Sequence, residues 1–278
     1  MKPLPYFLTS LLALSSGTLV AQTDVSGETL LLRQPSLSKT HVAFSYGGDL
    51  WVANRDGSSP RRLTVGPGPE IGPQFSPDGQ TIAFTATYDG NTDVYLVGLN
   101  GGMPRRLTFH PSAETAKGWS ADGQRVLFLS SGLSAPARSP KAFTVSVKGE
   151  LPQQVPIPTV GSWAKLSPDG REIAYSVASD AFNTWKRYRG GQTTPIRLVN
   201  LQTLDAEDIP HVNASDVQPL YVGNTIFFLS DRQRMMNIFA YDRATKQVRQ
   251  VTNHTDFDVK AIATDGQTLV YEQAGRLH

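Results

Sequence analysis

Hydrophobic and polar residues alternate in short runs along this chain, and no stretch shows a convincing helical period. The run QFSPDGQTIAF at residues 74–84 has the pattern of a strand, a tight turn and a second strand, and near-copies occur at 118–128 and 165–175. Asp-Gly pairs favour hairpin turns because glycine adopts positive φ without steric cost. The pattern therefore predicts antiparallel β structure built from repeated hairpins.

These hairpins belong to a longer repeat. A β-branched residue or leucine stands two positions before an aromatic residue in each second strand, in the pairs Val42/Phe44, Ile82/Phe84, Val126/Phe128, Ile173/Tyr175, Ile226/Phe228 and Leu269/Tyr271. The aromatic residues are 40, 44, 47, 53 and 43 positions apart. In the first five units a third strand and a shorter fourth strand follow, and two of the fourth strands read RRLT, at 61–64 and 105–108. Four antiparallel strands in about 40–50 residues are typical of a β-propeller blade.

The repeat predicts an all-β, six-bladed β-propeller over residues 30–278 whose sixth blade is incomplete. We place the blades at about 30–64, 67–108, 110–156, 158–210 and 212–252, with a partial sixth blade at 254–278. Because the sixth unit stops at His278, where its third strand should begin, we expect the chain to be the N-terminal part of a longer protein. An open ring exposes a strand edge, so we also expect marginal stability and a tendency to form homo-oligomers.

The first 21 residues have the plan of a secretory signal peptide. Lys2 precedes an apolar run from Leu4 to Ala21. The alternative is a membrane anchor, but the run is short for a span and contains Ser, Thr and Gly. We therefore expect export to the periplasm and no membrane contact after cleavage. The chain contains no cysteine, so stability in that compartment would come from packing and not from disulfide bonds.

Composition and motifs provide no catalytic site. The chain lacks a Gly-x-Ser-x-Gly elbow, a His-Glu-x-x-His motif and any cysteine nucleophile, and we predict neither catalytic residues nor cofactors in it. A Ser-His-Asp set that meets only in the fold stays open at this stage. The net charge of +2 is too small to indicate nucleic acid as a partner.

Two short alternations of potential metal ligands occur, at 89–93 and at 254–258. The first resembles the start of a calcium loop, but Val94 occupies the position where that loop needs glycine. The second has no fourth candidate ligand nearby. We therefore predict a polar hairpin tip at the first segment and no metal site at either.

The longest repeat contains a cluster of basic and aromatic residues in an insertion between the second and third strands of blade 4. Its members are Trp185, Lys186, Arg187, Tyr188 and Arg189. One interpretation is a solvated loop whose aromatic side chains pack on the rim of the blade. The other is a site whose guanidinium groups bind a carboxylate, from a peptide terminus or from another domain of the same protein.

Four carboxylates occupy similar places in the loops that enter the first strand of a blade: Glu70, Glu114, Asp216 and Asp258. Because the first strand of a blade is innermost, these side chains could surround one mouth of the central channel. There they would favour cationic or amino-terminal groups of a passing peptide. The alternative is that they are ordinary polar loop residues.

The repeats resemble TolB-like six-bladed propellers, whose units carry SPDG turns and RRLT-like closing strands. The segments LLRQPSLSKTHVAFSYGGDLWV (31–52), WKRYRGGQTTPI (185–196) and FFLSDRQRMMNIFAYD (227–242) resemble the first propeller of Tricorn-type serine peptidases, a similarity that runs from about Leu30 to His278. The resemblance implies a longer hydrolase with a second, seven-bladed propeller, a PDZ module and a split catalytic domain that holds the catalytic Ser and His.

The resemblance also implies the function that we expect. The chain would be the non-catalytic propeller of an exported peptidase, taking part in proteolysis by gating or guiding peptides or unfolded polypeptide and by contacting the downstream domains. One alternative is a TolB-like periplasmic scaffold that binds proteins and has no peptidase. A second is the propeller of a prolyl-oligopeptidase-type exopeptidase.

Overall fold

The computed structural model describes residues 29–132, 140–177, 181–182, 187, 189–191, 193 and 195–278. The signal peptide expected at residues 1–21 lies outside this part of the chain. Within the described residues, no helix is long and apolar enough to cross a membrane.

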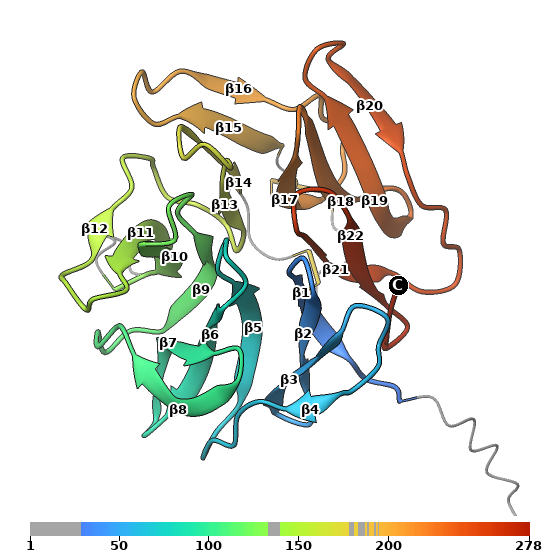
Figure 1. Ribbon diagram of the computed structural model, residues 1–278. Helices are drawn as coiled ribbons and strands as arrows, with labels where there is room; N and C mark the ends of the chain where they lie inside the picture. Colours follow the sequence, from blue (N-terminus) through green and yellow to red (C-terminus); the bar gives the residue numbers. More distant parts are fainter. Residues whose placement is uncertain are drawn as a thin grey trace, which may run out of the picture.

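Six antiparallel sheets surround a central axis (Figure 1). Blade 1 contains β1 (Arg33–Leu37), β2 (His41–Tyr46), β3 (Asp49–Asn54) and β4 (Arg61–Arg62), and blade 2 contains β5 (Glu70–Phe75), β6 (Thr81–Tyr88), β7 (Asn91–Gly98) and β8 (Gly101–Arg106). Blade 3 contains β9 (Glu114–Trp119), β10 (Arg125–Ser130), β11 (Lys141–Ser146) and β12 (Gln153–Gln154), and blade 4 contains β13 (Ala164–Leu166), β14 (Glu172–Ser176), β15 (Ile196–Asn200) and β16 (Ala206–Asp208). Blade 5 contains β17 (Asp216–Val222), β18 (Thr225–Gln233), β19 (Met235–Asp242) and β20 (Gln247–Gln250), and blade 6 contains β21 (Val259–Thr264), β22 (Leu269–Gln273) and β23 (Arg276–Leu277). The predicted all-β, six-bladed propeller is confirmed.

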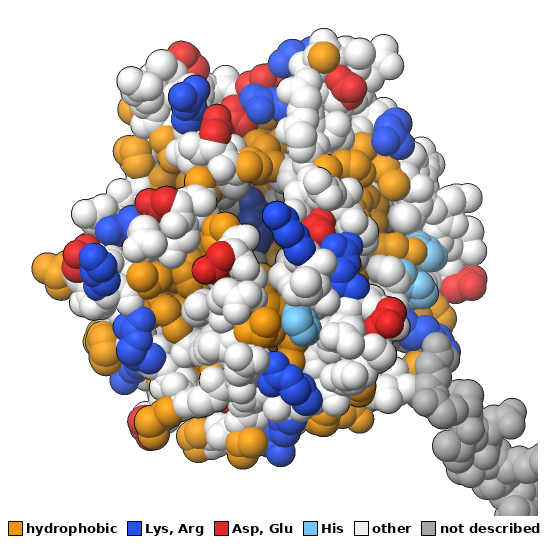
Figure 2. Space-filling model, in the orientation of Figure 1, with side chains coloured by type: hydrophobic (Ala, Val, Ile, Leu, Met, Phe, Trp, Pro, Cys, Tyr) orange, Lys and Arg blue, Asp and Glu red, His pale blue; other side chains and the backbone are white. Residues whose placement is uncertain are grey.

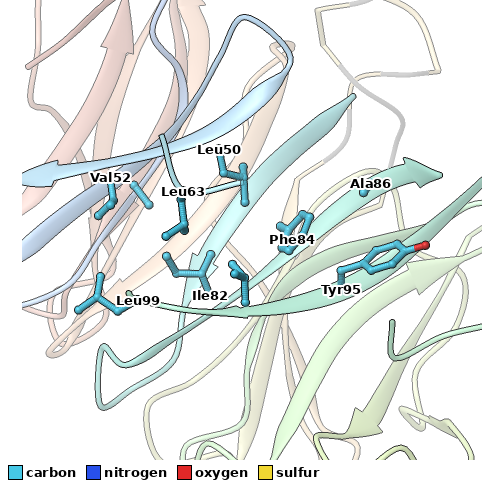
Figure 3. Close-up of a cluster of buried hydrophobic side chains, with 10 residues drawn as sticks. Leu50, Val52, Leu63, Ile82, Phe84, Ala86, Tyr95 and Leu99 are labelled. Atoms are coloured by element: carbon cyan, nitrogen blue, oxygen red, sulfur yellow. The ribbon is translucent and has the colours of Figure 1, made fainter. Parts of the chain in front are cut away.

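In each second strand, the residue pair of the repeat and the residue between its two members form a triplet, and this triplet makes contacts between blades. In β6, Ile82 and Phe84 face blade 1 and pack in a buried cluster that includes Ala43 (Figure 3). Ala83 lies between them on the opposite face of the strand and packs against blade 3, beside Phe128. Each of the six buried clusters among the described residues joins two neighbouring blades in this way. The hydrophobic core is therefore divided into inter-blade layers, and burial of each large side chain contributes about 1.5–3 kcal/mol.

In blades 1 and 2 the RRLT segment ties the fourth strand to its own blade and to the next one. In blade 1 the Arg62 guanidinium pairs with Asp49 at 2.8 Å, and the Thr64 hydroxyl accepts the backbone N–H of Leu50 at 3.1 Å. Arg61 donates to a backbone carbonyl of blade 2. The equivalent contacts in blade 2 are Arg106 with Asp93 (2.7 Å), the Val94 N–H with Thr108 Oγ1 (2.9 Å) and Arg105 with the Val147 carbonyl (2.5 Å). The two copies of the motif therefore make the same two attachments.

The ring closes where β1 of blade 1 meets β21 and β22 of blade 6 (Figure 1). The backbone N–H of Leu32 donates to the Gly275 carbonyl at 3.0 Å, and the N–H of Gln34 donates to the Glu272 carboxylate at 2.9 Å. Val270 joins the apolar cluster of blade 1. The sixth blade has three strands and still meets blade 1, so the ring is closed and not open as expected, because the apolar sides of the two sheets pack directly.

The Asp-Gly turns provide a first test of local backbone energetics. Gly79 has φ of +72°, and a Cβ built on it would lie 3.3 Å from the Cβ of Ser38. We expect Gly79→Ala to lower the melting temperature by about 2–4 °C, since an L-residue at this φ costs about 1 kcal/mol. Gly191→Ala is the matched control, because that glycine has open space around it and no positive φ, and its melting temperature should not fall. Equal melting temperatures for both variants in a thermal scan would contradict the prediction.

Candidate functional site

The first strands of the six blades line a passage along the axis of the ring. Two cavities lie along this axis. The smaller one, of about 100 Å³, lies near the starts of the first strands, and the larger one, of about 290 Å³, lies near the Asp-Gly turns at their other ends. Gln74, Lys165, Leu220 and Ala263 line both cavities, so they mark the narrow middle of the passage. Figure 2 shows the surface hollowed at the centre of the ring, with Lys or Arg atoms inside the hollow.

Lys165 crosses this narrow middle. It starts from β13 in blade 4, and its ammonium donates a hydrogen bond to Oε1 of Gln74 on β5 in blade 2. Blade 3 lies between these two blades, and a Cβ built on its Gly118 would be only 3.4 Å from the Lys165 Nζ. Gly118 therefore lies directly beside the lysine ammonium. The backbone carbonyl of Gln74 also accepts the indole N–H of Trp119 at 2.8 Å, and this bond holds β5 in place.

The charged side chains among the described residues of the smaller cavity wall, Lys117 and Lys165, are both positive. Lys117 on β9 lies with its ammonium 4.6 Å from the ring centroid of Trp163, a cation–π contact. Burial, together with the nearby Lys117 charge, lowers the pKa of Lys165 to about 7. Among the described residues that line the smaller cavity there is no carboxylate, and the other polar side chains are Gln34, Gln74, Thr85, Thr115 and Gln218.

The four carboxylates predicted at the channel mouth lie at the beginning of β5, β9 and β17 and directly before β21. Their exposed fractions are very small: 0% for Glu70, 3% for Glu114, 2% for Asp216 and 4% for Asp258. Burial raises the pKa of Glu114. These side chains point into the junctions between blades, so contact between them and a peptide stays a prediction.

Glu70 shows what such a carboxylate does in the fold. It accepts hydrogen bonds from the backbone N–H of Leu50 in blade 1 at 3.2 Å, from the hydroxyl of Thr64 and from the hydroxyl of Tyr88. Burial and the contact with Glu70 raise the pKa of Tyr88. The carboxylate thus satisfies buried donors from two blades and joins them.

The later blades repeat this use of an acidic side chain. Asp258 accepts the backbone N–H of Met236 in blade 5 at 3.0 Å. Asp216 accepts from Nδ1 of His211 and from the Arg232 guanidinium, both at 2.9 Å. Like Glu70, these two aspartates therefore connect neighbouring segments of the chain by hydrogen bonds.

Comparison with known proteins identifies the propeller. Residues 29–278 match the family described as the Tricorn protease N-terminal beta propeller domain. The chain belongs to this family. Its resemblance to the first propeller of Tricorn-type peptidases, inferred from the quoted segments, is thereby confirmed.

Tricorn relatives are much longer than this propeller. Tricorn protease homolog 1 of Streptomyces coelicolor is 32% identical over 256 residues, which cover 88% of this chain and 23% of that protein. The crystal structure of the tricorn protease matches with a TM-score of 0.77 at 20% identity, covering 89% of this chain and 25% of that one. TolB from Acinetobacter baumannii matches with a TM-score of 0.58 at 16% identity, covering 79% and 53% of the two chains. The two structural matches show a shared fold, and the Tricorn propeller described here spans less than a quarter of its curated relative.

The insertion of blade 4 in this Tricorn propeller is described only in part. Outside the described residues are three of the predicted contact residues, Trp185, Lys186 and Tyr188. Arg189 pairs with Asp231 of blade 5 at 2.9 Å, and Arg187 donates to the backbone carbonyl of Arg234 at 3.2 Å. The Arg189 guanidinium thus binds a carboxylate of the same chain. Contact between the insertion and a peptide or another domain stays a prediction.

The described part of the Tricorn propeller contains no group of three His, Asp or Glu side chains placed around a common point. The alternating potential ligands at 89–93 and at 254–258 therefore form no metal cluster there. Asp93 instead pairs with Arg106 at 2.7 Å. His254 packs beside Tyr271, with ring centroids 5.6 Å apart. These partners give the polar side chains structural roles.

Sequence reasoning missed the residues that line the Tricorn channel, although the strand register contains a signal for them. One position in each first strand pairs with the middle residue of the buried triplet in the second strand. The six residues at this position all line the wider axial cavity: Ser36, Gln74, Gly118, Lys165, Leu220 and Ala263. An alignment of the repeats on the triplet would therefore have pointed to Lys165.

Proposed function

We propose that this Tricorn propeller gates or guides peptides for an exported serine peptidase whose catalytic residues lie in other parts of the protein. The observation that carries the proposal is the pair of axial cavities, which share Lys165 and three other lining residues at the centre of the ring. Family membership and the 23% coverage of a curated tricorn protease homolog support the assignment to a larger peptidase.

The dimensions of the passage favour extended polypeptide as the cargo. The smaller cavity, of about 100 Å³, holds several water molecules but no folded domain. Polar amides and hydroxyls on its wall match the hydrogen-bonding groups of a peptide backbone, while Ile71 and Trp163 offer apolar surface. The closed ring would hold the neighbouring domains of the protein around a fixed entrance.

Export is supported by the N-terminal segment, in which Lys2 precedes the apolar run from Leu4 to Ala21. We expect protein isolated from the periplasm to begin near residue 22, as determined by N-terminal sequencing. Recovery of the intact N-terminus from the cytoplasm would contradict export.

The proposed role in peptide handling is tested on the full-length protein that carries this propeller. Gly118→Phe should lower the rate of peptide hydrolysis by about tenfold, because a side chain there would fill the narrow middle of the passage. Gly191→Phe, at an exposed glycine that lines neither axial cavity, is the control and should retain activity. Equal activity of the two variants would overturn gating through the passage.

Peptidase activity and sequence of the full-length protein separate the alternatives. A full-length protein with no peptidase activity would favour the TolB-like scaffold. A catalytic Gly-x-Ser-x-Gly elbow in the remaining sequence would favour the prolyl-oligopeptidase type.

A further inference from the structure

The narrow middle of the passage contains an ammonium group with unused donor capacity. A lysine ammonium carries three N–H donors, and Lys165 has one described partner, the amide oxygen of Gln74. That oxygen is neutral, so it does not compensate the charge. The Gln74 amide nitrogen donates to the Gly72 carbonyl at 3.3 Å, which orients the amide so that its oxygen faces Lys165.

The electrostatics of the passage favour an anion at this point. Lys117 raises the local positive potential, and together with burial it destabilises the protonated form of Lys165. No carboxylate stands among the described residues of the cavity wall. A bound anion would offset both unfavourable effects on Lys165.

A third donor lies in the same wall. The indole N–H of Trp163 is buried and has no hydrogen-bond partner among the described residues. Buried donors without partners cost about 1–3 kcal/mol, so they are uncommon unless a ligand or water completes them. Trp163 lines the cavity that Lys165 and Lys117 also line.

We propose that this part of the channel is a carboxylate-binding site, in which Lys165, oriented by Gln74 and assisted by Lys117, binds a carboxylate of a passing peptide. The inference rests on the proposed peptide-handling function and names the chemistry that the passage selects. The carboxylate comes either from the C-terminus of the peptide or from an Asp or Glu side chain. The charge preference is opposite to the one expected from the acidic residues at the strand starts, because those residues are buried.

Three tripeptide probes distinguish the two sources in calorimetric titrations of the full chain. The probes are acetyl-Ala-Ala-Ala with a free C-terminal carboxylate, its C-terminal amide, and acetyl-Ala-Glu-Ala amide. At least one of the two carboxylate probes should bind more tightly than the uncharged amide, by about tenfold or more. Preference for the first probe alone would assign the site to C-termini, and preference for the third would assign it to acidic side chains.

Substitutions locate the effect. Lys165→Met should abolish the preference for carboxylate probes, Lys117→Met should reduce it, and the exposed Lys148→Met is the matched control that should keep it. Gln74→Glu should also abolish it, since it introduces a carboxylate beside Lys165 without changing the size of the side chain.

Each remaining outcome counts against a specific claim. Binding of all three probes with equal affinity, or a carboxylate preference that survives Lys165→Met, would overturn the carboxylate site and leave the proposed peptide handling intact. Failure of every probe to bind would overturn both.

Discussion

Replacing Glu70 by alanine is expected to lower the free energy of unfolding by about 3–5 kcal/mol. The change removes the acceptor for the hydroxyls of Thr64 and the half-buried Tyr88, leaves the Leu50 N–H with Thr64 Oγ1 as its remaining acceptor, and opens a cavity between blades 1 and 2. A loss of this size corresponds to a fall in melting temperature of about 10 °C or more for a domain of this length. Urea denaturation followed by circular dichroism measures it.

Glu150→Ala is the control for this substitution. Glu150 is exposed, and its ion pair with Arg125 is 3.8 Å long, so its removal should change stability by less than about 0.5 kcal/mol. Glu70→Gln should fall between the two, because an uncharged amide of the same size retains part of the hydrogen bonding. A loss below about 1 kcal/mol for Glu70→Ala would show that Glu70 does not hold the junction.

Replacing Lys165 by methionine is expected to stabilise the propeller at neutral pH and to remove part of its pH dependence. The pKa of Lys165 is about 7 in the folded chain and 10.5 in its ordinary state. Between these values the unfolded chain binds a proton that the folded chain has lost, so stability rises with pH across this window. Below pH 7 the full cost of the buried charge is present in the unmodified chain.

The expected gain from Lys165→Met is therefore largest at pH 6–7 and disappears toward pH 10. After allowance for water in the channel, we expect about 1–2 kcal/mol, or about 3–6 °C in melting temperature. Thermal scans from pH 6 to pH 10 compare this variant with Lys148→Met, whose lysine is exposed. A gain that does not vary with pH would show that the effect comes from packing and not from the charge.

The fold could be predicted from sequence because its signals are local and repeated. The triplet around Ile82 and Phe84 and the turn at Gly79 each report on a few neighbouring residues, and the repeat multiplies the signal. Closure between β1 and β21 could not be predicted in this way. It depends on the sides of two sheets that are far apart in the chain, and no single segment encodes that contact.

The candidate site was predicted less well, for a physical reason. Glu70 and its counterparts were placed correctly at the start of the innermost strands, but their side chains turn into the junctions. There they accept backbone N–H groups from the third strand of the preceding blade, such as those of Leu50 and Met236, because a buried N–H must find an acceptor. Lys165 was overlooked because its neighbours on the axis come from other blades, such as Gln74 of blade 2.

The seam between the first and last blades has a consequence for biosynthesis. Gln34 and Glu272, which meet there, are separated by 238 positions in the chain. The apolar side of blade 1 around Phe44 therefore stays uncovered on the ribosome until nearly the whole propeller has been made. Such late, long-range contacts slow folding and prolong the time during which a nascent chain can aggregate or recruit a chaperone.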